Sequence, residues 1–160
     1  GPFGRTSLLD AVHLACVQMN NARNARRAIL IVSDGGDNHS RMKPRQIRND
    51  VLESDLQTYA IGIYDDPADG KLAPEELNGP NLLQELADET GGRHYRVDDL
   101  EHLGSVAERI SVDLRNEYLL GYFSTNPDHD GKYRRVKVTV QSTNGNTRTY
   151  HRPGYYAPTD

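Results

Sequence analysis

Two aspartates and two glycines follow an apolar run in the segment Ala28 to Ser40, AILIVSDGGDNHS. A run of this length and composition predicts a strand that is covered on both faces. Asp34 then lies at the carboxyl end of that strand, which is where open α/β sheets bind their ligands. A carboxylate there could hold a metal ion, attack a phosphate, or begin a turn that Asp37 or Asn38 caps. From this stretch alone, the turn is the simplest interpretation.

The composition limits the size and class of the protein. The 160 residues, 36% of them hydrophobic, indicate one core and one domain with an appendage. The formal charge is −4, the pI is near 5.9, and the basic residues are scattered, so we expect no nucleic-acid partner. No apolar stretch reaches the roughly 18 residues of a spanning helix, so we expect no membrane insertion. The single cysteine, Cys16, excludes an intramolecular disulfide framework.

Residues 1–117 are predicted to alternate between helix and strand. Apolar spacing and end signals predict helices over 6–19, 43–54, 81–90 and 99–116, and strands over 28–33, 57–64 and 93–97. Cys16 lies on the apolar stripe of the first helix and is most simply a core residue. The alternation implies a parallel sheet with right-handed crossovers, and therefore an α/β fold.

Residues 118–160 have a different pattern. YLLGYFS, the alternating RRVKVTVQ, and TRTYH after an Asn144-Gly145 turn predict antiparallel strands that form a β extension. We expect its aromatic residues to cover the sheet, and a peptide-binding surface is the alternative. Between the second strand and the third helix, residues 65–80 are predicted to be a long loop, and such loops are usually functional or mobile.

Two motifs and the ending of the chain resemble a known family. GRTSLLDAV, followed after one helix by LIVSDGGDN, is similar to the second and third metal-site segments of the von Willebrand factor A domain. The ending YLLGYFS…DGKYRRVKVTV…RPGYYAP resembles that of bacterial von Willebrand factor A-related proteins. The resemblance spans nearly the whole chain. It implies a doubly wound, mainly parallel sheet, of which residues 1–117 would be the carboxyl-terminal portion and residues 118–160 the antiparallel extension.

The same resemblance implies a metal-ion-dependent adhesion site. In that site one carboxylate, one threonine and two serines hold Mg²⁺, or Mn²⁺ or Ca²⁺ in its place. The threonine falls on Thr6 and the aspartate on Asp34, with Ser33, Gly35 and Asp37 in the surrounding loop. The first segment of the motif, Asp-x-Ser-x-Ser, has no counterpart in this sequence. Because Mg²⁺ needs several oxygen ligands, we expect this chain to bind it weakly or not at all.

The function implied by the resemblance is non-enzymatic protein binding, in which an acidic side chain of a protein partner completes the shell of the metal. We expect the intact protein to be longer, bacterial, and secreted, periplasmic or attached to the cell envelope. In the family, the segment that is missing here contributes the strand beside residues 28–33. Without it that strand edge would be exposed, and exposed edges pair, so we expect a homodimer or a domain swap.

Other functions make different demands on the same residues. A metal-independent interaction module would bind through residues 65–80 or the tyrosine-rich tail. A phosphohydrolase with Asp34 as nucleophile would need a lysine and further acids, for which Asp65 and Asp66 are candidates. A nucleotide-binding enzyme is not expected because neither G-x-G-x-x-G nor a P-loop motif is present. The absence of a G-x-S-x-G elbow argues against a serine hydrolase.

Overall fold

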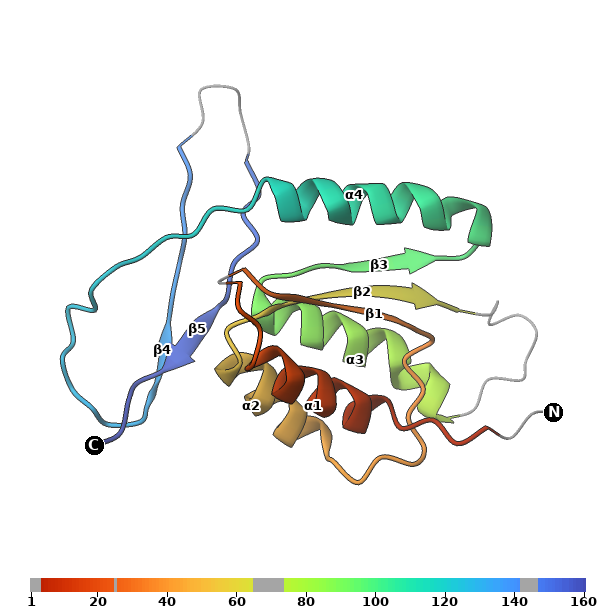
Figure 1. Cartoon of the computed structure of the whole chain (residues 1–160), viewed down its shortest axis with the longest axis horizontal. Coiled ribbons are helices and arrows are strands. Elements are labelled where there is room, and N and C mark those ends of the chain that lie inside the picture. The colour runs from red at the N-terminus through yellow and green to blue at the C-terminus, as the bar shows by residue number, and fades with distance from the viewer. Residues whose placement is uncertain (1–3, 25, 65–73, 142–146) are drawn as a thin grey trace.

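The body of the protein is a parallel sheet with helices on both faces (Figure 1). The computed structural model describes residues 4–24, 26–64, 74–141 and 147–160. Its sheet has the order β1-β2-β3, built from β1 (Ala28–Ser33), β2 (Gln57–Ile63) and β3 (His94–Val97). All pairings in it are parallel. The predicted α/β class and strand direction are therefore confirmed.

The helices enclose two hydrophobic clusters, one on each face of the sheet. The described elements are α1 (Leu8–Met19), α2 (Pro44–Glu53), α3 (Pro74–Thr90), the 3₁₀ turn η2 (Leu100–His102) and α4 (Leu103–Arg115). Helices α1 to α3 lie on one face and α4 on the other (Figure 1). The larger cluster is made of Leu8, Leu9, Val12, Cys16, Ile29, Ile31, Ile47, Val51, Leu56, Ala60, Leu83 and Leu86. The smaller cluster, under α4, is made of Tyr59, Ile61, Tyr95, Val97, Val106 and Ile110.

Several helix ends follow the local signals of the sequence. Pro44 occupies the first turn of α2, where its missing N–H costs nothing. The Asp99 carboxylate accepts a hydrogen bond from Glu101 N–H at 2.9 Å and so caps η2. After α3, Gly91 takes a φ of +76°, the left-handed conformation with which many helices end.

Helix α3 begins earlier than predicted. Gly79 and Pro80 belong to the predicted loop over residues 65–80, yet both lie inside α3, which starts at Pro74. A proline suits the first helical turn, so Pro74 is the better start signal. The predicted loop over 65–80 is therefore wrong for residues 74–80, and its remaining residues, 65–73, lie outside the described residues.

Strand β1 is covered on one face only, which corrects the prediction of a strand buried on both faces. Ile29 and Ile31 point into the larger cluster, whereas Leu30 is 51% and Val32 is 53% exposed. The cause is that the cluster under α4 is built on β2 and β3, while β1 is the edge strand of the sheet. β1 is a terminal strand of the described sheet, and self-association through its edge stays a prediction.

The antiparallel extension forms, but with less strand than predicted. Strands β4 (Tyr133–Arg135) and β5 (Gly154–Tyr156) pair antiparallel, with Tyr133 opposite Tyr156. Residues 118–124 and 147–151 belong to no strand. Tyr118 is 87% and Phe123 is 100% exposed, so the predicted covering of the sheet by these aromatic residues is wrong. Alternating apolar residues favour a strand but do not provide the neighbour with which it must pair.

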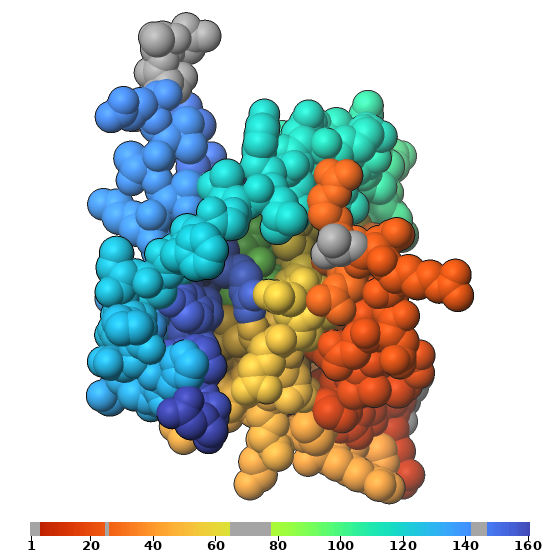
Figure 2. All heavy atoms as spheres, turned by 60° about the vertical axis from the view of Figure 1, so that its left-hand side comes forward, coloured from red at the N-terminus to blue at the C-terminus, as the bar shows by residue number. Residues whose placement is uncertain are grey.

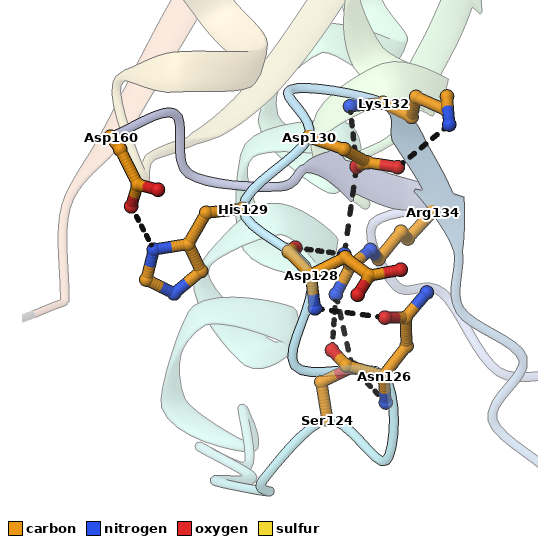
Figure 3. A network of polar contacts seen from close by, with 8 residues as sticks. All are labelled: Ser124, Asn126, Asp128, His129, Asp130, Lys132, Arg134 and Asp160. Carbon is orange, nitrogen blue, oxygen red and sulfur yellow. Dashed lines mark hydrogen bonds and ion pairs between the residues drawn. The ribbon is translucent and has the colours of Figure 1, made fainter.

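A polar loop before β4 is organised around one guanidinium group (Figure 3). The Arg134 side chain donates to the backbone carbonyls of Asn126, at 2.5 Å, and of Asp128. It also lies 3.6 Å from Asp130 Oδ1, and its side chain is only 15% exposed. A single side chain thus satisfies several acceptors of the loop and fixes its path.

Candidate functional site

Two segments that are far apart in the sequence meet where β1 ends. The Thr6 carbonyl accepts hydrogen bonds from Asn38 N–H at 3.1 Å and His39 N–H at 3.0 Å. The Asn38 side chain in turn accepts from Thr6 N–H at 2.9 Å. The segment that carries Thr6 is therefore tied to the loop that begins at Asp34. This is the carboxyl edge of the sheet, where the sequence predicted a site.

Asp34 begins a turn through one of its two carboxylate oxygens. Its Oδ1 accepts from Gly36 N–H at 2.9 Å, and the Ser33 hydroxyl accepts from Gly35 N–H at 3.0 Å. The simplest interpretation of the sequence, a turn residue, is thus confirmed for one oxygen. The other oxygen, Oδ2, has no hydrogen-bond partner among the described residues, and the side chain is exposed.

Thr6 contributes a second available oxygen at this edge. Its backbone groups are engaged with Asn38 and His39, whereas its hydroxyl makes no hydrogen bond to a described residue. One carboxylate oxygen and one hydroxyl are hard donors of the kind that Mg²⁺ prefers. Within the described ranges, no group of three or more His, Cys, Asp and Glu side chains is placed to hold a metal. Thr6 and Asp34 therefore each carry an oxygen of the type that suits Mg²⁺.

Asp37 is occupied in holding the start of α1. Its Oδ2 accepts from Leu9 N–H at 2.8 Å and from the Ser40 hydroxyl at 2.5 Å, and its Oδ1 accepts from Ser40 N–H at 3.1 Å. The N-cap residue of α1, Ser7, makes no side-chain cap. Asp37 supplies the missing acceptor from another segment, and its negative charge suits a helix N-terminus.

Asp10, in the first turn of α1, binds the backbone of the segment that follows the loop after β1. The sequence did not predict this contact. The Asp10 carboxylate accepts from Met42 N–H at 2.9 Å and from Arg41 N–H at 3.0 Å. These two hydrogen bonds hold the pKa of Asp10 below its usual value of 3.8. The sequence shows an acid in the first turn of a helix, but it does not show which backbone N–H groups that acid would bind.

Gly35 lets α3 approach the loop backbone. It has a φ of +79°, and a Cβ there would collide with the carbonyl of Gly79 in α3. A Cβ on Gly79 would in turn collide with the carbonyl oxygen of Asp34. The two glycines thus fix the position of Asp34 against the helix, which gives a physical role to the glycine that the resemblance had placed in the loop.

Tyr64 is a neighbour of Asp34 that sequence reasoning treated only as the end of a strand. Ser33 pairs with Gly62, so the two chain segments leave the sheet side by side. Burial, opposed by the charge of Arg96 and aided by that of Asp34, raises the pKa of Tyr64 to about 12. The phenol contacts His94 Nε2 at 2.9 Å, and burial lowers the pKa of His94. A neutral phenol therefore lies beside the edge.

A phosphohydrolase with Asp34 as nucleophile would need a lysine and further acids near that carboxylate. No lysine forms an ion pair or hydrogen bond with its carboxylate in the ranges that the structure covers. The two further acids suggested for such an enzyme, Asp65 and Asp66, lie outside the described residues.

Comparisons with known proteins add a distant structural likeness. No protein-family model matches the sequence, and no curated protein matches it. A similar solved structure is that of an uncharacterized membrane-spanning protein from Vibrio fischeri, with a TM-score of 0.44 and 19% identity. The alignment covers 68% of this chain and 56% of that one, so this chain spans little more than half of its length. In the described part of this chain, no helix has the length and apolar composition needed to cross a bilayer.

Proposed function

We propose that this chain is a non-enzymatic, protein-binding domain of the von Willebrand factor A type, with a Mg²⁺-dependent site at the carboxyl edge of its sheet. Thr6 and Asp34 are the protein ligands of this site. The observation that carries the proposal is the set of hydrogen bonds between Thr6 and residues Asn38 and His39, because it joins the two motif segments that such a site requires. Helices on both faces of a parallel sheet also agree with a doubly wound arrangement.

The chemistry of the proposed site follows from the two donors. Asp34 Oδ2 and the Thr6 hydroxyl supply two oxygens, and water fills the remaining positions until an acidic side chain of a protein partner replaces one of them. Ser33, Gly35 and Asp37 hold the loop and do not bind the ion. Because the sequence has no Asp-x-Ser-x-Ser segment, we expect a dissociation constant of roughly 1–10 mM.

A metal-independent interaction module is the second candidate, and the exposure of the tail favours it. Tyr118, Leu119 and Phe123 lie almost fully in solvent, and clustered exposed apolar side chains commonly mark interaction sites. The two candidates differ in one measurable property, since only the first makes the affinity for a partner depend on Mg²⁺.

Calorimetric titration of Mn²⁺ and Mg²⁺ tests the proposal on the wild type and three variants. Asp34→Asn should weaken binding about tenfold or abolish it, and Thr6→Val should weaken it less, since it removes a neutral ligand. Glu108→Gln removes an exposed carboxylate on α4 and should leave binding unchanged. Equal binding by Asp34→Asn and the wild type, or no binding by the wild type up to about 10 mM ion, would contradict the metal site.

A further inference from the structure

A groove lies at the opposite end of the sheet from Asp34. It has a volume of about 810 Å³ and lies between the carboxyl end of α3, residues of α2, and both arms of the extension. Figure 1 places the extension at the end where β1 to β3 begin, and Figure 2 shows it, in blue, beside the gold and yellow residues of α2 and β2. The groove therefore shares no residue with the proposed metal site.

The extension lines this groove with positively charged side chains. Arg135, Lys137 and Arg148 border it, all three are exposed, and none forms an ion pair with a described residue. On the opposite wall, Arg48 is held by Glu85 and Glu89. The chain as a whole carries a charge of −4, so this concentration of cations is a local reversal of sign. Such a reversal attracts and orients anionic groups.

Aromatic rings also line the groove. Tyr150 contacts two guanidinium groups, with Arg93 at 4.4 Å and Arg148 at 5.0 Å from the centre of its ring. Tyr133 and Tyr156 meet edge to face with their centres 5.2 Å apart. Burial raises the pKa of Tyr133, which keeps its hydroxyl protonated and able to donate. Rigid rings and phenolic donors beside cations are suited to a polypeptide that carries carboxylates.

We propose that this groove binds an extended, carboxylate-rich segment of a protein through Arg135, Lys137 and Arg148. Arginine pairs with carboxylates in a bidentate geometry, and acidic motifs are commonly recognised by such clusters. The groove favours a peptide over a nucleic acid because Asp88 and Glu89 also line it. These two acids repel the phosphates that are fixed along a nucleic-acid backbone, whereas a peptide can place its backbone N–H donors opposite them and turn its carboxylates toward the cations.

Fluorescence anisotropy with fluorescein-labelled decaglutamate tests the proposal on the whole chain. The wild type should bind the peptide at low ionic strength, and raising the salt from about 0.05 M to about 0.5 M should weaken binding. The double variant Lys137→Gln/Arg148→Gln should bind about tenfold more weakly. The matched control Arg109→Gln/Arg115→Gln removes two exposed cations from α4, outside the groove, and should bind as the wild type does.

The outcomes separate this proposal from general electrostatics and from the metal site. Equal weakening by the two double variants, equal binding of a neutral Gly-Ser peptide, or tighter binding of a single-stranded oligothymidylate would overturn it. Far-ultraviolet circular dichroism of each variant establishes that the fold is retained. Asp34→Asn should leave decaglutamate binding unchanged, so failure of the groove and failure of the metal site give distinguishable results.

Discussion

The Asp37 carboxylate accepts a hydrogen bond from the backbone N–H of Leu9 at 2.8 Å, across 28 positions of the sequence. This contact places the first turn of α1 against the loop that leaves β1. Asp10, from that same turn, accepts in return from the backbone of Arg41 and Met42. The two aspartates thus hold the segments of Thr6 and Asp34 together, and the geometry of the edge depends on both.

Replacing Asp37 should destabilise the fold. Asp37→Ala removes the acceptor of Leu9 N–H and both contacts to Ser40, and the loss of a helix cap typically costs about 1–2 kcal/mol. Urea unfolding followed by circular dichroism measures this change. Asp128→Ala, at an exposed carboxylate that makes no hydrogen bond or ion pair to a described residue, should stay within about 0.5 kcal/mol of the wild type. Similar stabilities of the two variants would show that Asp37 does not cap α1.

Asp10 should contribute to the acid sensitivity of the protein. The N–H groups of Met42 and Arg41 favour its ionised form, so its folded pKa lies below the usual 3.8. The unfolded chain therefore takes up this proton at a higher pH than the folded chain does. The contribution to stability is present above the unfolded pKa and is lost as the pH falls through the folded pKa. Titration of the Asp10 carboxyl carbon by NMR should give a pKa below 3.8, and a value at or above it would contradict the geometry.

Gly35 and Gly36 should respond differently to the same substitution. Gly35→Ala places a Cβ into the Gly79 carbonyl at a positive φ and should cost roughly 2 kcal/mol or more. Gly36 has its nearest contact at Asp34 Oδ1, 3.3 Å away, and that carboxylate can move. Gly36→Ala should therefore cost less. Thermal unfolding of both variants compares them, and an equal or smaller loss for Gly35→Ala would contradict the close approach of α3.

Removing Arg134 should loosen the loop before β4 without unfolding the body. Arg134→Gln deletes the donors that bind the carbonyls of Asn126 and Asp128. Amide hydrogen exchange in residues 124–130 should then rise about tenfold, which corresponds to the loss of one well-formed charged hydrogen bond. Arg135→Gln, at the neighbouring exposed arginine, should leave exchange in this loop unchanged. If exchange rises equally in both variants, the pairing of β4 with β5, and not the Arg134 side chain, orders the loop.

The body of the fold could be predicted because its signals are local. The apolar stripe of α1, the proline at the start of α2 and the aspartate that caps η2 each act within a few residues. The positive φ of Gly91 is also a local feature, because it depends on the end of α3 and not on the elements that pack against the helix. Such rules do not depend on which element lies next to which.

The errors lie where the outcome depends on a distant neighbour. Leu30 and Val32 have the composition of a buried strand, and their exposure follows from the place of β1 at the edge of the sheet. Residues 118–124 are apolar and aromatic, as many strands are, but no described strand pairs with them. The early start of α3 was missed because Gly79 and Pro80 resemble breakers, while Gly79 serves the approach to Asp34.

The candidate site could be predicted only in part for the same reason. Thr6 and Asp34 were found from motifs that resemble a family, and the structure joins their segments. The role of Asp37 as a cap for α1 depends on a contact across two segments and has no local signature. Tyr64 was missed because its side chain folds back toward Gly62 and His94, a tertiary arrangement that strand periodicity does not encode.

Paramagnetic broadening by Mn²⁺ locates the proposed ion most directly. In ¹⁵N-¹H spectra of the chain, substoichiometric Mn²⁺ should broaden the amides of Thr6, Gly35 and Gly36 before any other amides. The amide of Arg148, at the opposite end of the sheet, should stay sharp, and Asp34→Asn should abolish the effect. Uniform broadening over exposed carboxylates, or a pattern that Asp34→Asn leaves unchanged, would contradict a metal site at this edge.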